Sequence, residues 1–179
     1  EFPPVFPEQF NLADYYLDAR IREGRGERIA VITGNVQLTY ADVAAQANRM
    51  ANLLAEAGVY PEDRVLLALP DCPEFVATFF AVLKRGAVVA MVNPELPTED
   101  YDYYLSYSRA RAFVCDEALY AKIRPICDRA KNLRVVFRRR GGLEALMAQA
   151  SERFENEPTS KDDFAIWLFT SGSTGKPKA

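Results

Sequence analysis

Histidine is missing from all 179 residues of the sequence. A Ser-His-Asp triad or a Cys-His pair therefore cannot be complete within this chain. Cysteine is scarce: Cys72, Cys115 and Cys127 are an odd number at scattered spacings, unlike a disulfide framework or a zinc site. We expect these three residues to be reduced thiols in the core.

Long apolar runs are also missing, since none approaches the roughly 18 residues that a membrane-spanning helix needs. Residues 1–4 lack the basic-then-apolar order of a secretion signal. Positive charge is not in excess, because 22 Lys and Arg face 25 Asp and Glu, and a net charge of −3 does not favour nucleic acid. A hydrophobic content of 49% is typical of a globular domain with a core. We expect a cytoplasmic protein without membrane or nucleic-acid partners.

The most informative segment is the last one, where the apolar run 164–169 leads into a polar loop without acidic residues. Glycines allow a tight turn and close approach of backbone N–H groups to a ligand, hydroxyls add donors, and lysines add positive charge. These are the groups that hold a chain of phosphates. The candidate phosphate-binding residues are Thr170, Ser171, Gly172, Ser173, Thr174, Gly175, Lys176 and Lys178.

Two other loops of related composition do not fit. A Walker A loop requires Ser or Thr after Gly-Lys, whereas Pro177 follows Lys176 here and biases that lysine toward extended backbone. A hydrolase elbow requires Gly two residues before the nucleophile, whereas Ser171 stands two residues before Ser173. A flexible polar linker is the remaining alternative. It is disfavoured because linkers seldom follow an apolar strand directly.

Upstream of the loop, apolar runs alternate with helical patterns. Five buried strands are expected at 64–69, 87–92, 112–115, 133–137 and 164–169. Helices are expected at 12–22, from 39 to Gly58, at 74–85, from 98, at 116–130 and at 143–154, and a hairpin at 29–38 turns at Gly34-Asn35. Asn11, Thr39 with Asp42, and Asp116 are the predicted helix caps. The alternation predicts an α/β fold with a mostly parallel sheet and flanking helices.

The segment Phe-Thr-Ser-Gly-Ser-Thr-Gly-Lys-Pro-Lys at 169–178 resembles the phosphate-binding signature of the adenylate-forming enzymes. Leu-Thr-Tyr at 38–40 and Leu-Lys-Arg-Gly-Ala at 83–87, with Asn93-Pro94 after it, resemble two upstream family motifs in the same order. One departure is Ala179, where the family more often has Gly. The resemblance implies the first subdomain of the family's large N-terminal domain, with 1–163 as an α/β subdomain and 164–179 opening the ATP site.

The same resemblance implies a two-step reaction. A carboxylate attacks the α-phosphorus of ATP to give an acyl-adenylate and pyrophosphate, and a thiol, usually of coenzyme A, then displaces AMP. Mg²⁺ is expected on the phosphates, with no metal ligands in this segment. The family's catalytic lysine and C-terminal domain would lie beyond Ala179, so no catalytic residue is assigned within residues 1–179.

Three other features have more than one interpretation. Lys84 could contact a CoA phosphate, by similarity to CoA ligases, but its place at a helix end favours a role in complementing the helix dipole. The tyrosines at 101, 103, 104 and 107 are interpreted as packing or a protein contact. Arginines 138–140 are interpreted as a solvated turn, since a run of three is short for a nucleic-acid patch.

Segments 6–11 and 86–108 resemble those of benzoate-type CoA ligases, including enzymes acting on aminobenzoates. An aryl acid is therefore the favoured substrate. A medium-chain acyl-CoA ligase and a peptide-synthetase adenylation domain share the same loop and stay open as alternatives. A non-catalytic α/β module that binds anions is the alternative outside the enzymes.

Overall fold

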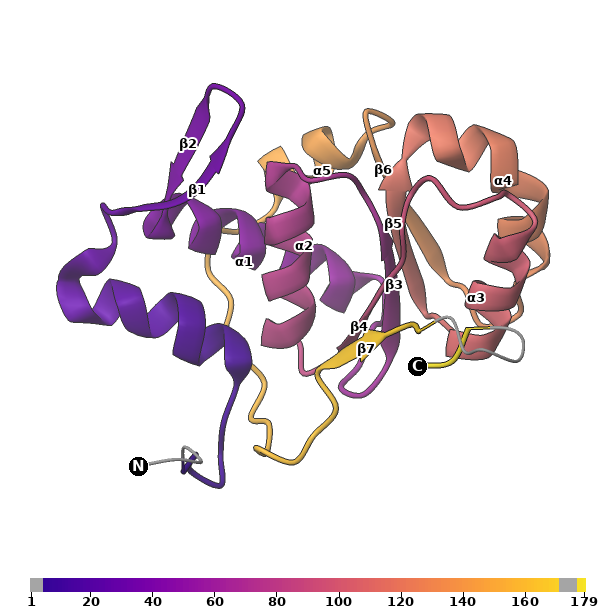
Figure 1. Cartoon of the computed structure of the whole chain (residues 1–179). Coiled ribbons are helices and arrows are strands. Elements are labelled where there is room, and N and C mark those ends of the chain that lie inside the picture. Colours follow the sequence, from indigo (N-terminus) through magenta and orange to yellow (C-terminus); the bar gives the residue numbers. More distant parts are fainter. Residues whose placement is uncertain (1–4, 171–176) are drawn as a thin grey trace.

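The computed structural model describes residues 5–170 and 177–179, and in them helices flank both faces of a sheet (Figure 1). The strands are β1 (Ile29–Thr33), β2 (Val36–Thr39), β3 (Arg64–Ala68), β4 (Val88–Met91), β5 (Ala112–Asp116), β6 (Val135–Arg139) and β7 (Ile166–Leu168). The helices are α1 (Tyr40–Glu56), α2 (Pro73–Lys84), α3 (Asp100–Ser108), α4 (Glu117–Arg129) and α5 (Leu143–Gln149). Two π-helical turns, η1 (Asp14–Asp18) and η2 (Ile21–Arg25), precede them.

Five of the strands form one parallel sheet in the order β6-β5-β3-β4-β7, and β1 pairs with β2 in a separate antiparallel hairpin. β3 is the central strand, with Val65 opposite Val89 of β4 on one side and Ala112 of β5 on the other. Its residues 65–68 are fully buried, as expected for a parallel strand covered on both faces. The predicted α/β fold with a mostly parallel sheet is confirmed.

Helices cover both faces of the sheet, with α1, α2 and α5 on one side and α3 and α4, from two consecutive connections, on the other (Figure 1). Strand alternation supplies both cores. Val65 and Leu67 of β3 face the first layer, and Leu66 and Ala68 face the second. The two cores therefore lie on opposite faces of the same sheet.

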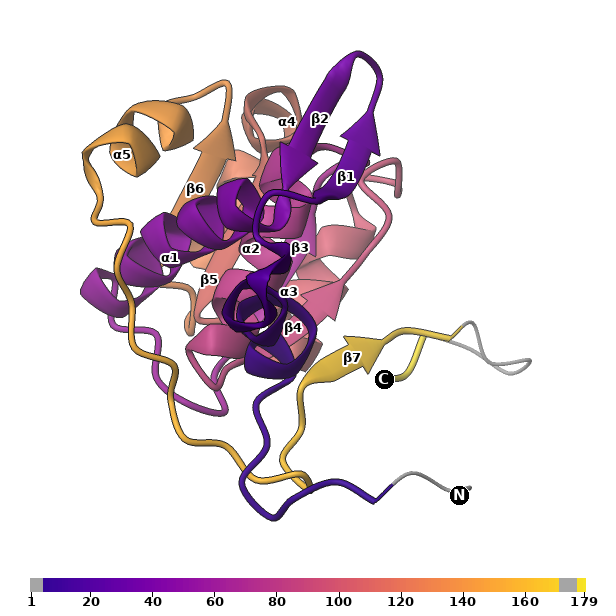
Figure 2. The same ribbon diagram turned by 90° about the vertical axis from the view of Figure 1, so that its left-hand side faces the viewer.

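A further layer lies outside α1, formed by the N-terminal helical segment and the β1–β2 hairpin (Figure 2). Leu17 of η1 is buried there against Val43 and Ala47 of α1. The predicted turn Gly34-Asn35 is confirmed, since Thr33 pairs with Val36 across it and Gly34 has φ +57°. The small residues of α1 let it pack between this layer and the sheet.

Local capping signals account for two helix starts. The Asn11 carboxamide oxygen accepts hydrogen bonds from the N–H groups of Ala13 and Asp14 at 2.9 and 3.3 Å. Thr39 and Asp42 form a reciprocal capping box at the start of α1, with Asp42 N–H donating to the Thr39 hydroxyl at 3.1 Å. Both predictions are confirmed, because each cap needs only residues two or three positions apart.

Two predictions of local structure are wrong. Helix α5 ends at Gln149 instead of near Phe154, because Asn52 on α1 donates to the carbonyl oxygens of Ser151 and Arg153 and holds that backbone outside a helix. Asp116 stands at the start of α4, but its carboxylate accepts a hydrogen bond from Arg139 at 3.1 Å and makes no cap bond to α4. In both cases the hydrogen-bonding group is bound by a side chain that is distant in the sequence.

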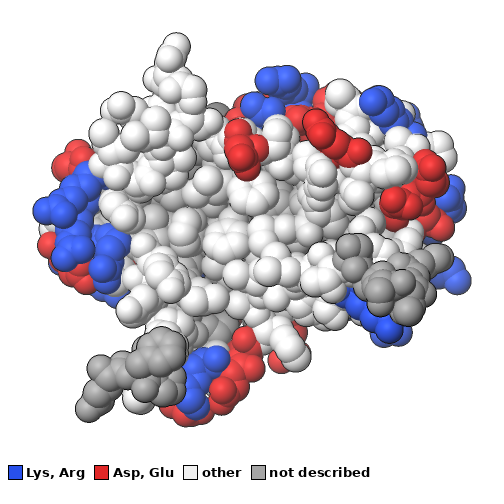
Figure 3. Space-filling model, viewed as in Figure 1, with Lys and Arg blue, Asp and Glu red and all other residues white. Residues whose placement is uncertain are grey.

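The surface seen in Figure 3 has few charged side chains across its middle, and Lys, Arg, Asp and Glu gather near its margins. β7 crosses this view in Figure 1, and its Ile166 and Leu168 are 37% and 64% exposed. Its Trp167 packs on the opposite side with the α3–α4 core. β7 is therefore covered on one face only. Among the helices that the structure describes, none has the length and apolar character that crossing a bilayer requires.

The three cysteines are free and buried, in agreement with the expectation of core thiols. Burial raises the pKa of the Cys72 and Cys127 thiols to about 11, and raises that of Cys115, which is fully buried, further. A raised pKa lowers the thiolate fraction at neutral pH, and only the thiolate is the nucleophile.

We therefore predict that a water-soluble disulfide reagent at pH 8 labels these three thiols slowly in the native protein and rapidly in urea. The native rate should rise with pH toward 11, because each pKa is raised. Labelling of single-cysteine variants checks this, with a short thiol peptide as the reference. Peptide-like rates at Cys115 in the folded protein would contradict the burial described.

Candidate functional site

The candidate loop leaves the sheet at the carboxyl end of β7 and returns to its own starting point. Thr170 and Lys178 form an antiparallel bridge, in which the Thr170 N–H donates to the Lys178 carbonyl at 2.9 Å and the Lys178 N–H donates back at 3.2 Å. Both side chains are exposed. The bridge joins the two ends of the loop beyond the carboxyl ends of the parallel strands. Ligands bind at this side of open α/β sheets.

The structure thus brings together two of the eight predicted phosphate-binding residues. The other six lie outside the described residues, and their assignment stays a prediction from the sequence: Ser171, Gly172, Ser173, Thr174, Gly175 and Lys176.

Aromatic side chains from α3 lie against the strand that carries the loop. The Tyr104 ring is 4.8 Å from that of Phe169, and the Tyr107 ring is 6.3 and 6.0 Å from those of Trp167 and Phe169. The Tyr103 hydroxyl donates a hydrogen bond to the Pro177 carbonyl at 2.5 Å. Packing is the right interpretation for this group of tyrosines. The contact of Tyr103 with the loop end was missed, because its partner lies 74 residues away.

Lys84 is enclosed in the structure. Its side chain is 1% exposed, and its ammonium lies 2.7 and 2.5 Å from the carboxylate oxygens of Asp18 and 3.2 Å from the Asn156 carboxamide oxygen. Asn156 in turn donates to Asp18 at 2.7 Å. A buried, paired ammonium argues against the predicted contact with a CoA phosphate. Lys84 joins η1, the end of α2 and the segment before β7.

The arginines at 138–140 are not simply solvated. Arg139 donates to Glu74 at the start of α2 and to Asp116 at the end of β5, at 3.0 and 3.1 Å, and Arg138 pairs with Glu117 at 3.1 Å. The interpretation of this run as a solvated turn is therefore wrong for Arg139, which is 15% exposed and paired with two carboxylates, whereas the Arg138–Glu117 pair is partly exposed to solvent.

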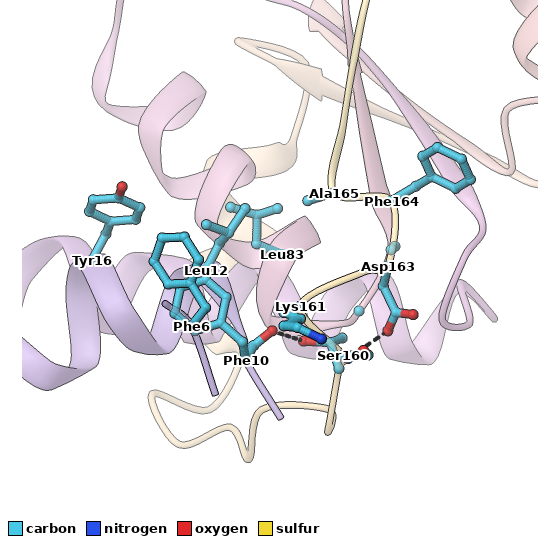
Figure 4. A pocket seen from close by; sticks show the side chains of 13 residues that line it. Phe6, Phe10, Leu12, Tyr16, Leu83, Ser160, Lys161, Asp163, Phe164 and Ala165 are labelled. Carbon is cyan, nitrogen blue, oxygen red and sulfur yellow. Dashed lines mark hydrogen bonds between the residues drawn. The ribbon is translucent and has the colours of Figure 1, made fainter. Parts of the chain in front are cut away.

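A cavity of about 200 Å³ lies at the other end of β7, between the N-terminal segment and residues 159–165 (Figure 4). Phe6, Phe10, Leu83 and Phe164 supply much of its apolar lining. Its frame is made by hydrogen bonds: the Phe10 N–H donates to the Thr159 carbonyl at 2.8 Å, and the Thr159 hydroxyl donates to the Phe10 carbonyl at 2.8 Å. None of the described loop ends lines this cavity, which lies where the N-terminal segment anchors the backbone before β7.

Glycine is required at this joint. Gly86, which ends α2, has φ +63°, and a Cβ there would lie 3.2 Å from the Thr159 side chain and 3.3 Å from that of Glu157. Beside it the Glu157 N–H donates to the Lys84 carbonyl at 2.8 Å, and Arg85 forms an ion pair with Glu157. The close approach lets residues 156–163 pass over the end of α2 into β7.

Residues 18–179 match the model of a protein family described as AMP-binding enzyme. The chain belongs to the AMP-binding enzyme family. It is 36% identical over 183 residues to a benzoate–CoA ligase from Thauera aromatica, covering 98% of this chain and 35% of that protein. It is 31% identical over 177 residues to a 3-hydroxybenzoate–CoA ligase from Aromatoleum sp. (strain CIB), covering 94% of this chain and 34% of the relative.

Among solved structures, an anthranilate CoA ligase, AuaEII, in complex with anthranoyl-AMP superimposes with a TM-score of 0.88 at 25% identity. The superposition covers 96% of this chain and 33% of that structure. The fold is thus that of the N-terminal part of adenylate-forming enzymes. The chain spans about a third of the length of these relatives.

The Lys84–Asp18 pair leads to a prediction about stability. Replacing Lys84 by Met leaves the Asp18 carboxylate without its counter-charge in a largely buried site, which is expected to cost about 3–5 kcal/mol. Lys161→Met, which removes the ion pairs of Lys161 with exposed Glu8 and Asp162, should destabilise the protein far less, because water screens exposed charges. Urea denaturation of the full-length gene product measures both.

A double variant provides the control for this prediction. Asp18→Leu together with Lys84→Met removes both charges and should recover much of the lost stability, because an apolar pair needs no counter-charge. If Lys84→Met were no more destabilising than Lys161→Met, the enclosed pair would not hold the three segments together.

Proposed function

We propose that this chain is the N-terminal segment of an ATP-dependent, AMP-forming aryl-CoA ligase. Such an enzyme activates a benzoate-type acid as the acyl-adenylate and transfers the acyl group to coenzyme A. The observation that carries the proposal is the family-type loop sequence at 169–178 with its described ends joined at the carboxyl end of β7. Within the segment, we propose that 1–163 is an α/β subdomain and that 164–179 opens the ATP site.

The loop would act on the departing diphosphate. Negative charge builds on the β- and γ-phosphates as the carboxylate attacks the α-phosphorus, and donors already aimed at that charge lower the barrier without reorganisation. Thr170 and Lys178 are exposed, and the one hydrogen bond given for the Thr170 hydroxyl is a long one of 3.5 Å to the Lys178 carbonyl, so both side chains could take this role. From the sequence we assign three further hydroxyl donors, Ser171, Ser173 and Thr174. Gly172 and Gly175 would let the backbone N–H groups approach the phosphates, and Lys176 would be the second cation.

Magnesium fits this site as an ion carried by the nucleotide. The described part of the chain contains no group of three or more side chains of the kinds that ligate metals. Mg²⁺ often keeps several waters and binds through substrate phosphates with few protein ligands, so we propose that it enters this site on the phosphates of ATP. Bound there, it would neutralise phosphate charge beside the lysines. Coenzyme A is the proposed acyl acceptor, and the catalytic lysine is expected outside this segment.

The proposed substrate is an aryl carboxylic acid. Support comes from the relatives named for benzoate and 3-hydroxybenzoate and from the structure that holds anthranoyl-AMP. We also propose a cytoplasmic location, which suits three buried, free cysteines.

The test is carboxylate-dependent ATP–pyrophosphate exchange by the full-length gene product. Benzoate, aminobenzoates, hydroxybenzoates, fatty acids and amino acids form the panel, and an aryl acid is expected to support exchange. Lys176→Ala and Lys178→Ala should each lower kcat/KM for ATP about ten- to hundredfold, the equivalent of a charge-assisted hydrogen bond of roughly 1.5–3 kcal/mol.

Lys161→Ala is the matched control, because it removes a lysine at the opposite end of β7 and should leave exchange unchanged. Exchange with a fatty acid or an amino acid alone would contradict the aryl assignment but keep an adenylate-forming enzyme. A folded full-length protein that exchanges with no acid would favour the non-catalytic anion-binding module.

A further inference from the structure

Helix α3 contacts both ends of the candidate loop. Tyr103 and Tyr107 are four residues apart and so share one side of the helix, with ring centroids 5.4 Å apart. Tyr104 and Tyr107 contact Phe169, the last residue before Thr170. At the other end of the loop, the Tyr103 hydroxyl bonds to Pro177, the residue before Lys178.

The bond to Pro177 has a specific chemical consequence. Proline has no backbone N–H, so its carbonyl is the only backbone group through which Pro177 can be hydrogen-bonded. That carbonyl belongs to the peptide unit that leads into Lys178, and the Lys178 backbone is bridged to Thr170. The Tyr103 hydroxyl therefore restrains the peptide unit directly before the Lys178 Cα atom, which carries the lysine side chain.

We infer that Tyr103 is a positioning residue for the phosphate-binding loop, acting through Pro177 and the Thr170–Lys178 bridge. The inference rests on the proposed function. Donors and cations stabilise developing phosphate charge best when their directions are fixed before the substrate binds. The bridge joins the loop ends to each other, and Tyr103 fixes the bridged end to α3. Without the hydroxyl the loop ends stay joined but lose this hydrogen bond to the helix.

The variant Tyr103→Phe removes one oxygen and keeps the ring that packs beside Tyr104 and Tyr107. In the full-length gene product we expect KM for ATP in pyrophosphate exchange to rise about three- to tenfold, the range for one hydrogen bond. KM for the carboxylic acid and the thermal unfolding midpoint should stay unchanged. A merely structural role would lower the amount of active enzyme, and hence the apparent kcat, without a selective change in KM for ATP.

Tyr120→Phe on α4 is the matched control, since it removes a hydroxyl on the same side of the sheet while keeping the ring that Arg138 covers at 5.0 Å. It should behave as wild type in both KM values. A wild-type KM for ATP in Tyr103→Phe would overturn the inference. A fall in kcat accompanied by a lower unfolding midpoint, with KM for ATP unchanged, would overturn it equally.

The two proposals fail in different ways. If the wild-type protein exchanges with no acid, the proposed function fails and the role of Tyr103 fails with it. If the wild type exchanges, Lys178→Ala is impaired and Tyr103→Phe is not, only the inference about Tyr103 fails.

Discussion

The pairing of β7 with β4 is the interaction on which the position of the candidate site depends. Three residue pairs join the strands, Val89 with Ile166, Ala90 with Trp167 and Met91 with Leu168. A strand this short, paired on one side in the described structure, needs further restraints. Hydrogen bonds to the N-terminal segment hold the backbone before β7, and aromatic rings from α3 cover Trp167 and Phe169. The loop that follows β7 thus starts from a fixed point.

The enclosed Lys84, Asp18 and Asn156 connect three segments that are far apart in the sequence. A buried ion pair adds little net stability, because the loss of hydration offsets much of the attraction. Each charge nevertheless requires its partner, so η1, the end of α2 and the segment before β7 are coupled. The sequence suggested that Lys84 complements the dipole at a helix end. It did not reveal the pairing with Asp18, because that carboxylate lies 66 residues away. This coupling explains why Lys84 is enclosed, although the family motif at 83–87 would suggest that it contacts a CoA phosphate.

The sequence predicted those parts of the structure that depend on near neighbours. Buried runs and helical spacing gave the strands and helices, and Asn11 and Thr39 bond to residues close by in the chain. The end of α5, the partner of Asp116 and the hydrogen bond from Tyr103 to Pro177 could not be predicted, since each joins groups from distant parts of the sequence. For the candidate site, the sequence was enough to predict the composition of the loop and its position directly after a strand. The bridge between Thr170 and Lys178 and the hydrogen bond from α3 required the three-dimensional arrangement.

The topology also explains why the edge strand can carry the loop. In open α/β sheets a ligand crevice forms where neighbouring strands connect in opposite directions, here between β3 and β5. At that position Arg139 binds both Glu74 and Asp116, so its positive charge is already paired with carboxylates beyond the strand ends. An anion there would have to displace two carboxylates from the guanidinium. At β7 Lys178 is exposed, and its backbone hydrogen bonds with Thr170 hold it in place. The paired charge at the central crevice and the exposed Lys178 beside β7 are the charge arrangement that the proposed phosphate site requires.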